Sequence, residues 1–370
     1  MTIGILKEPA HETRVSLLAD AAATLTKKGI TVVTENGAGE KAFCSNTDYE
    51  KAGVQIKSRS EVLSAADILL TIHQPDEQEI AGLKIKILIG VFQPLFNAEL
   101  MKQWAKAGIT AFSLDMLPRT TRAQAMDVLS SQANIAGYKA VLTAANCYGR
   151  YFPMFMTAAG SIAPAKVLIL GAGVAGLQAI VTARRLGAVV EVFDTRPAVK
   201  EEVMSLGAKF IEVEGAADAS RAGGYAVEQS EDFMLRQKGK IAESTAKADI
   251  IITTAQIPGK KAPVLITEEM IKGMRNGSVI IDLAAATGGN TPLTKNNETV
   301  KYNGVSIVGD SSLQSTMPSD ASKMYGKNVL NFLQLIITKE GAINLNWEDD
   351  LVKGSCITHN GEITHERLKS

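Results

Sequence analysis

Short apolar runs alternate with amphipathic segments along the first third of the chain, a pattern typical of strands and helices that follow one another. Apolar positions recur at helical spacing within Val15–Lys28, between the β-branched runs Ile3–Leu6 and Ile30–Val33. Further strands are predicted at Ala66–Ile72, Ile85–Phe92 and Ile109–Leu114, with a helix at Ala98–Ala107. This pattern predicts an α/β sheet that has no glycine motif. Such a domain usually shapes substrate or partner contacts while a neighbouring domain holds the cofactor.

The segment Lys166–Arg196 has the pattern of a complete strand–helix–strand unit. An apolar run ends at Gly171, Gly173 and Gly176, and a helix-compatible segment continues to Leu186. The three glycines allow a tight turn, a close approach of backbone to a pyrophosphate, and close packing of helix on strand. Val174 and Ala175 lie at the N-terminus of this helix, which favours negative charge. We therefore expect all five residues to bind a dinucleotide.

Asp194 follows the second strand of this unit, 23 residues after Gly171. A carboxylate at this place can accept hydrogen bonds from a ribose diol and would repel a 2′-phosphate. The spacing therefore favours NAD(H) over NADP(H) as the ligand of this chain.

The alternation continues to the end of the chain and predicts two doubly wound α/β domains. Strands are predicted at Lys209–Val213, Asp249–Thr254, Ser278–Leu283 and Val305–Val308, with a helix at Thr267–Met274. Two long helices are expected to join the domains: Ser130–Arg150, capped by its serines, and Ser319–Ile337, capped by Ser319 or Asp320. The expected domains are residues 1–129 with 319–370, and residues 130–318. The nucleotide is expected in the cleft between them.

Composition excludes several other classes of protein. Lysine plus arginine equals aspartate plus glutamate at 39 each, without a long basic run, which argues against a nucleic-acid surface. The three cysteines, Cys44, Cys147 and Cys356, lack paired short spacing, so neither a disulfide framework nor a metal site is indicated. No segment approaches the roughly 20 apolar residues of a membrane span. We expect a soluble chain that docks on other components.

The interval Glu214–Lys240 does not fit the alternation. It contains Ala222–Ala226, AGGYA, among small and polar residues, and is too long for a simple turn. A loop of this kind is either a lid over the nucleotide or a surface insertion. The aromatic ring of Tyr225, next to two glycines, slightly favours the lid.

A second polar cluster, Pro118–Asp127, precedes the first long helix. Arg119, Gln124 and Asp127 supply a cation, an amide and a carboxylate, which together can hold a nicotinamide carboxamide in one orientation. The alternative is a helix N-terminus with ordinary charge pairs. The predicted position beside the cleft favours the functional interpretation.

The sequence offers no well-placed general base. Of four histidines, only His73 ends a predicted strand, and a structural role suits that position better. Oxidation of a hydroxy or amino acid needs a proton acceptor, whereas hydride transfer between two nicotinamides needs only positioning groups. The second reaction is therefore favoured.

These motifs, in this order, resemble the NAD(H)-binding component, domain I of the alpha subunit, of proton-translocating NAD(P) transhydrogenase, in the superfamily that includes alanine dehydrogenase. The resemblance runs from GILKEPAHETRVSL through PRTTRAQAMDVLSSQANIAGYKAV, LGAGVAGLQAI and AGGYA. It continues through TTAQIPGKKAPVLITEEM and SVIIDLAAATGGN to GEITHERL. It covers essentially the whole chain.

The resemblance implies roles for individual residues. Arg119, Gln124 and Asp127 match a loop that orients the dihydronicotinamide, with Gln124 also reaching toward NADP(H) on a partner, and Ser130 matches a contact to the ring amide. Asp194, Thr195 and Arg196 are implied around the adenosine ribose. Further implied cofactor contacts are Gly224 and Tyr225 in a closing loop, Gln237, Ala255, and Gln256, where the family has leucine.

The family activity is hydride transfer from NADH to NADP+ bound on a partner, coupled to proton translocation by a membrane component. The resemblance also implies a homodimer that is peripheral on the cytoplasmic face of the inner membrane through its partners. One alternative is an alanine dehydrogenase-like enzyme, but LLTIHQP, ILIGVFQPL and Ala286 stand where that relative has lysine, histidine and aspartate, although Arg14 is shared. A non-catalytic NAD-binding subunit is the other alternative.

Overall fold

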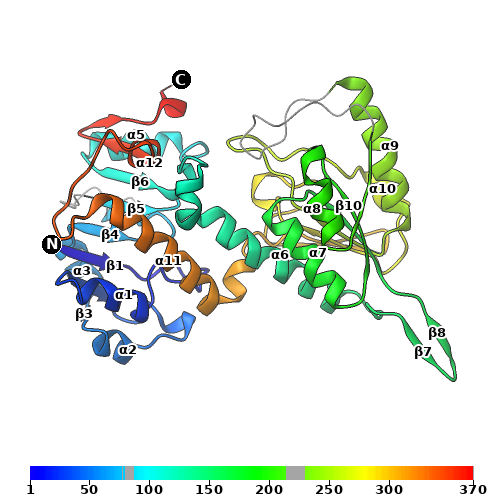
Figure 1. Cartoon of the computed structure of the whole chain (residues 1–370), viewed down its shortest axis with the longest axis horizontal. Helices are drawn as coiled ribbons and strands as arrows, with labels where there is room; N and C mark the ends of the chain where they lie inside the picture. Colours follow the sequence, from blue (N-terminus) through cyan, green and yellow to red (C-terminus); the bar gives the residue numbers. More distant parts are fainter. Residues whose placement is uncertain (77, 80–86, 214–229, 370) are drawn as a thin grey trace. The chain divides into compact units, whose positions relative to one another are not determined.

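The structure is a computed structural model that describes residues 1–76, 78–79, 87–213 and 230–369 (Figure 1). The chain divides into two compact units. Unit 1 comprises Met1–Gln132 and Ser315–Ser370, and unit 2 comprises Ala133–Gln314. Across the described ranges, no helix combines the length and apolar character required to cross a membrane.

Unit 1 is built on an eight-stranded sheet in the order β17-β16-β6-β5-β4-β1-β2-β3. The six strands from the first third of the chain are parallel, whereas β16 runs antiparallel to β6 and β17 antiparallel to β16. Their bounds are β1 Thr2–Ile5, β2 Thr31–Glu35, β3 Gln55–Lys57, β4 Ile68–Leu70, β5 Ile87–Gly90, β6 Thr110–Ser113, β16 Cys356–His359 and β17 Glu362–Ile363. The chain moves outward from β1 in both directions, so the strand order reverses between β1 and β4.

Helices cover both faces of this sheet because successive strand residues point to opposite sides. Ile68 and Leu70 of β4 pack in a core with α1 and α11, whereas Leu69 packs in a second core with α3 and α5. The helices of unit 1 are α1 Ala19–Thr26, α2 Asn46–Lys51, α3 Arg59–Ala65, α5 Ala98–Lys106, α11 Pro318–Ile336 and α12 Asp350–Ser355. The predicted strands and helices of the first third are therefore confirmed, although the first helix begins only at Ala19.

Unit 2 repeats this plan in a seven-stranded sheet, β11-β10-β9-β12-β13-β15-β14, which is parallel except for β14. Its strands are β9 Lys166–Leu170, β10 Val189–Phe193, β11 Lys209–Phe210, β12 Ile250–Thr253, β13 Val279–Asp282, β14 Thr299–Tyr302 and β15 Val305–Val308. Strand order reverses between β9 and β12. The prediction of two doubly wound α/β domains is confirmed.

Alternation of side chains again divides the strands of unit 2 between two cores. Val167 and Ile169 pack with α6 and α7, and Leu168 and Leu170 pack with α9 and α10. The helices are α7 Val174–Arg185, α8 Lys200–Ser205, α9 Glu231–Lys247 and α10 Glu268–Lys272. Helix α6, Val128–Cys147, begins in unit 1 and continues into unit 2, whereas α11 lies in unit 1 over its whole length.

Three local predictions are wrong. Helix α6 begins at Val128, and the carboxylate of Asp127, not a serine, caps it. Helix α11 has no side-chain cap from Ser319 or Asp320, because it begins at Pro318 with Met317 as its N-cap, so both residues lie inside the first turn. The interval predicted as a loop up to Lys240 is helical from Glu231, where Ser230 accepts a hydrogen bond from the N–H of Phe233.

Sequence reasoning missed a two-stranded hairpin, β7 Phe155–Thr157 and β8 Gly160–Ile162, which projects from the rest of unit 2 (Figure 1). All six strand residues are exposed. Such short strands carry too little pattern to be recognised from sequence.

Candidate functional site

The glycine turn of unit 2 lies at the carboxyl end of β9, beside the place where the strand order reverses. Gly171 has a φ of +106°, and a Cβ there would lie 2.3 Å from the Oγ1 atom of Thr254. Thr254 donates from this oxygen to the carbonyl groups of Leu170 and Gly171 at 3.3 Å. The turn is therefore held against the loop that follows β12.

The first turn of α7 packs too closely on the glycine turn to admit a side chain at Gly176. A Cβ there would lie 1.9 Å from the carbonyl oxygen of Gly171. Gly173 differs, because a Cβ on it would meet no atom within 4 Å, and this N-cap residue has no side chain that could cap α7. Open space in front of uncapped helical N–H groups fits a pyrophosphate, which the helix N-terminus would bind.

Asp194 follows β10, as predicted, but its carboxylate already has four hydrogen-bond donors. The backbone N–H groups of Ala172 and Arg196 donate at 2.7 and 2.8 Å, and the guanidinium of Arg196 donates twice, at 2.9 and 2.7 Å. A carboxylate has about four lone-pair sites. A ribose diol can therefore bind Asp194 only where a donor of Arg196 gives way. The paired cation also reduces the repulsion of a 2′-phosphate that the sequence argument assumed.

The other predicted contacts of unit 2 lie in separate elements. Ala255 and Gln256 follow β12, and the side-chain amide of Gln256 donates to the carbonyl of Leu283 at 2.8 Å. Thr195 is half-buried after β10, and Gln237 is half-buried in α9. Gly224 and Tyr225, predicted to form a closing loop, lie outside the described residues.

In unit 1, the segment from Arg119 to Ser130 forms a 3₁₀ helix, Thr121–Met126, followed by α6. Both oxygens of Asp127 accept hydrogen bonds from Ser130, one from its N–H at 2.9 Å and one from its hydroxyl at 2.6 Å. Asp127 therefore lies at a helix N-terminus, as the alternative interpretation predicted, and it caps the helix through these hydrogen bonds. Arg119 and Gln124 are exposed on the same short segment.

Three side chains that sequence reasoning missed hold this segment. Asn328 and Asn331 of α11 donate to the carbonyl of Ala125 at 2.9 and 2.8 Å, next to Gln124. Arg122 pairs with Asp349 at 2.5 Å and also with Asp350. A signal for Asn328 exists in the sequence, because it is a polar residue at helical spacing with the mostly apolar positions of α11 that the structure buries.

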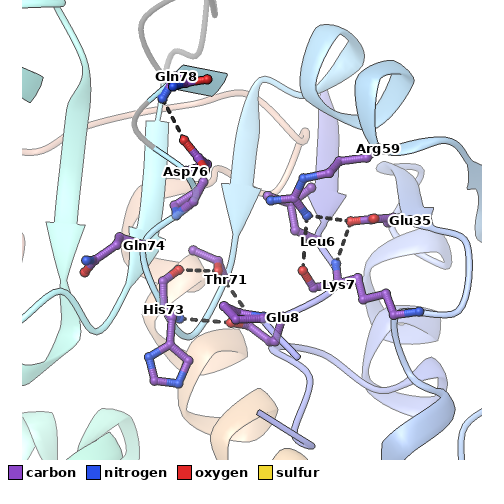
Figure 2. A pocket seen from close by; sticks show the side chains of 12 residues that line it. Leu6, Lys7, Glu8, Glu35, Arg59, Thr71, His73, Gln74, Asp76 and Gln78 are labelled. Carbon is purple, nitrogen blue, oxygen red and sulfur yellow. Dashed lines mark hydrogen bonds and ion pairs between the residues drawn. The ribbon is translucent and has the colours of Figure 1, made fainter. Parts of the chain in front are cut away.

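Unit 1 has its own polar pocket, of about 630 Å³, at the carboxyl ends of β1 and β4 (Figure 2). Glu8 lines it and accepts hydrogen bonds from the N–H groups of Ile72 and His73 at 2.6 and 3.0 Å, and from Thr71 at 3.1 Å. Burial raises the pKa of Glu8 despite these hydrogen bonds. Arg59, on the other side, pairs with Glu35 and Glu79. The pocket thus contains several groups that already bind one another.

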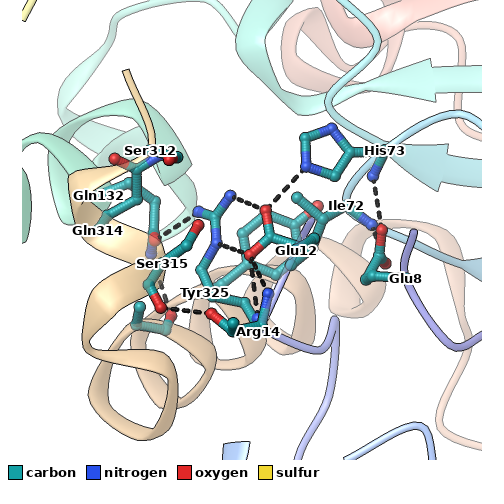
Figure 3. A network of polar contacts seen from close by, with 12 residues as sticks. Glu8, Glu12, Arg14, Ile72, His73, Gln132, Ser312, Gln314, Ser315 and Tyr325 are labelled. Carbon is teal, nitrogen blue, oxygen red and sulfur yellow. Dashed lines mark hydrogen bonds and ion pairs between the residues drawn. The ribbon is translucent and has the colours of Figure 1, made fainter. Parts of the chain in front are cut away.

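A buried ion pair lies next to Glu8 (Figure 3). Glu12 and Arg14 are 3% and 6% exposed and contact one another at 2.7 Å, and the Nε2 atom of His73 lies 2.8 Å from Glu12. Burial raises the pKa of Glu12, but the hydrogen bonds of Arg14 and His73 outweigh it and hold this pKa well below its usual range. Arg14 also donates to Gln132 at 2.8 Å. His73 is therefore part of a structural network.

Comparisons with known proteins agree with this arrangement. The family models "Alanine dehydrogenase/PNT, N-terminal domain" and "Alanine dehydrogenase/PNT, C-terminal domain" match residues 4–136 and 140–366. The NAD(P) transhydrogenase subunit alpha of Cereibacter sphaeroides is 46% identical, over 98% of this chain and 71% of that protein. An NAD(P) transhydrogenase alpha-subunit chain of Rhodospirillum rubrum is 44% identical, over 100% of this chain and 99% of that protein. A crystal structure of transhydrogenase from Sinorhizobium meliloti matches with a TM-score of 0.89 at 43% identity, covering 98% of this chain and 100% of that one.

Proposed function

The chain belongs to the alanine dehydrogenase/PNT family, among the NAD(P) transhydrogenase alpha subunits, and from this premise we propose that it binds NAD(H) for hydride exchange with NADP(H) on a partner subunit. The glycine turn of unit 2 is the observation that carries the proposal. Open space at Gly173, in front of the uncapped N-terminus of α7, suits the pyrophosphate.

We assign the adenosine half to the loop after β10. Asp194 and the neighbouring Thr195 bind the ribose, and Arg196 releases one of its two hydrogen bonds to Asp194 as the diol enters. Ala255 and Gln256, after β12, contact the nicotinamide half, because β12 lies on the opposite side of β9 from β10. Gly224, Tyr225 and Gln237 complete the contacts.

We assign orientation of the nicotinamide ring to the Arg119–Ser130 segment. The Ser130 hydroxyl donates to Asp127 at 2.6 Å, so the remaining lone pairs of these two side chains present acceptors to the NH2 group of a carboxamide. Arg119 adds a cation, and exposed Gln124 reaches toward the second nicotinamide. NADH, when bound, supplies the hydride; the residues of this chain only position it.

The partner subunits carry the remaining functions in this proposal. They bind NADP(H), and a membrane component couples hydride transfer to proton translocation and keeps this chain peripheral on the cytoplasmic face. Rapid mixing of the NADH-loaded chain with an NADP+-loaded partner tests hydride transfer in a single turnover. Enzyme-like oxidation of NADH with pyruvate and ammonia by the chain alone would support the alanine dehydrogenase alternative, and binding without hydride transfer would support a non-catalytic subunit.

Variants of Gln124 test the assignment of positioning. Gln124→Ala should lower the single-turnover rate by about 10- to 100-fold and change the dissociation constant of NADH by less than about threefold, because a group used only in the transition state affects rate and not binding. Gln103→Ala, at an exposed glutamine of α5, is the matched control. Equal losses of rate and affinity would reassign Gln124 to nucleotide binding.

We further propose that the chain forms a homodimer through the β7–β8 hairpin. Phe155, Met156 and Ile162 of the hairpin are 44%, 74% and 44% exposed, and the ring of Tyr151 stacks on that of Phe155 at 4.9 Å. A two-stranded hairpin is marginal on its own, so a second copy that covers these side chains would stabilise it. Met156→Asp should shift the mass measured by light scattering to that of a monomer. Met204→Asp, at a residue of α8 that is 54% exposed, should leave the mass unchanged.

A further inference from the structure

The loop Gly288–Asn290, which follows β13, carries an asparagine that nothing above employs. Asn290 is completely buried, and its side chain contacts the backbone of the loop after β12. Its Oδ1 atom accepts the N–H of Ala255 at 3.2 Å, while its Nδ2 atom donates to the carbonyl of Ala255 at 2.9 Å and to that of Pro263 at 2.8 Å. One side-chain amide therefore binds both backbone polar groups of a single residue.

Asn290 is itself held firmly. Its N–H donates to the Oδ2 atom of Asp282 at 2.6 Å, and its carbonyl accepts the N–H groups of Leu265 and Ile266 at 2.9 and 3.1 Å. Asp282, at the end of β13, is fully buried and also accepts the hydroxyl of Thr294 at 2.6 Å. The amide of Asn290 is thus anchored to a central strand before it reaches Ala255.

The two glycines before Asn290 make this anchoring possible. Gly288 and Gly289 have φ values of +102° and +76°, which L side chains rarely adopt. A Cβ on Gly289 would also lie 2.5 Å from the Cβ of Thr294 and 2.9 Å from the carboxylate of Asp282. The turn therefore needs glycine to bring Asn290 close to Asp282.

The loop that Asn290 holds is the one next to the glycine turn. Thr254, which precedes Ala255, donates to the carbonyl groups of Leu170 and Gly171. Hydrogen bonds thus lead from Asp282 through Asn290 to Ala255, and the preceding residue, Thr254, contacts the turn at Gly171. In a doubly wound sheet the two halves of a dinucleotide bind on opposite sides of the central strand.

We propose that Asn290 is a positioning residue for the nicotinamide half of NAD(H): it fixes the Ala255 backbone, and through it the wall of the site after β12. This inference rests on the proposed function. It predicts that loss of Asn290 weakens contacts to the nicotinamide half selectively, because the hydrogen bonds of Asn290 join the loops after β12 and β13, whereas Asp194 follows β10 on the other side of β9.

The test compares NADH with 5′-AMP, which lacks the nicotinamide half. Asn290→Ala should weaken NADH binding by about tenfold, since two backbone groups of Ala255 lose their partner, and should change the dissociation constant of 5′-AMP by less than about twofold. Equal weakening of both ligands, or none of either, would overturn the proposal. Asn296→Ala, at an exposed asparagine in the following loop, is the matched control.

A second variant covers the case in which the alanine variant does not fold. Asn290→Asp keeps the shape of the side chain and its acceptor for the N–H of Ala255, but an ionised carboxylate faces the carbonyls of Ala255 and Pro263. NADH affinity should therefore recover as pH falls and the introduced acid gains a proton that it can donate, while 5′-AMP affinity follows the pH dependence of the unmodified chain. The same pH dependence for both ligands would contradict the role. If the unmodified chain binds 5′-AMP but not NADH, the proposed function fails instead.

Discussion

Both sheets reverse their strand order beside their first strand, between β1 and β4 in unit 1 and between β9 and β12 in unit 2. The residues at these two reversal points differ. In unit 2, Gly173 leaves open space in front of the N-terminus of α7, while Gly171 and Gly176 permit the tight turn after β9 and its close packing on the helix. In unit 1, the residues after β1 carry Glu8, whose carboxylate accepts the N–H groups of Ile72 and His73 after β4. In unit 1, the carboxylate of Glu8 thus accepts hydrogen bonds from backbone N–H groups. We propose that a phosphate of the ligand accepts hydrogen bonds of the same kind in unit 2.

This difference shows that strand order alone does not make a nucleotide site. The reversal creates a place where two loops separate at the carboxyl edge of a parallel sheet. In unit 2 a glycine leaves that place free of side chains, whereas in unit 1 the polar side chains that line the pocket bind one another. The comparison predicts that substitutions in unit 2 change nucleotide affinity and that those in unit 1 change mainly stability.

The largest effect is expected at Gly176. Gly176→Ala places a methyl group 1.9 Å from the carbonyl of Gly171, so the turn must move, and we expect a loss of more than about 3 kcal/mol in unfolding free energy together with loss of NADH binding. Urea unfolding and fluorescence titration measure the two quantities.

Gly173→Ala is the matched variant, because its methyl group meets no protein atom within 4 Å. It should change the unfolding free energy by less than about 1 kcal/mol and weaken NADH binding by about tenfold or more, since the methyl group enters the space assigned to the pyrophosphate. Unchanged affinity in this variant would place the pyrophosphate elsewhere.

In unit 1, removal of one partner of the buried ion pair should be the most costly change. Glu12→Ala leaves the guanidinium of Arg14, 6% exposed, without its main partner, and should cost about 3 kcal/mol of unfolding free energy. NADH affinity of the folded protein should fall by less than about threefold. A large loss of affinity at unchanged stability would show that this network belongs to the nucleotide site.

The pH dependence of stability follows from the two carboxyl groups. The pKa of Glu12 is lowered in the folded state, so its contribution is complete above its unfolded pKa of about 4.5 and is lost as pH falls below it. Stability should therefore fall by up to about 1.4 kcal/mol per pH unit for this proton below pH 4. The pKa of Glu8 is raised, so its ionisation opposes folding as pH rises through and above 4.5.

The variants Glu12→Gln and Glu8→Gln separate these two effects. The stability difference between the unmodified chain and Glu12→Gln should shrink as pH falls from 5 to 3. Glu8→Gln should become relatively more stable as pH rises above 5. Parallel pH profiles of all three proteins in urea unfolding would contradict both assignments.

The smallest effect is expected at Lys7, an exposed cation that lines the unit 1 pocket. Because the groups of that pocket bind one another, Lys7→Ala should change the unfolding free energy by less than about 0.5 kcal/mol and leave NADH affinity within about twofold. A fivefold loss of affinity would show that nucleotide binds at both reversal points, and the contrast between the units would not hold.

The sequence by itself determined the two doubly wound sheets and the glycine turn, because strand runs, helical spacing and glycine positions are local patterns. The residue after β10 was also predictable from spacing, but its pairing with Arg196 was not. Asp127 shows the same limit: its residue type and place were predicted, whereas its cap on α6 depends on where the helix begins. Helix ends are decided within one or two residues by competing local hydrogen bonds.

Only the tertiary structure decided which side chains hold the loops. Asn328 and Asn331 contact Ala125 from about 200 positions away, and Asn290 contacts Ala255 from 35 positions away, between the loops that follow the neighbouring strands β13 and β12. These contacts join segments that are distant in sequence. They produce no periodic pattern in the sequence, because each is a hydrogen bond between one side-chain amide and one backbone group. Local patterns therefore predict the scaffold and the kind of ligand, whereas the orientation of each binding loop depends on long-range pairs that form only when the sheet is complete.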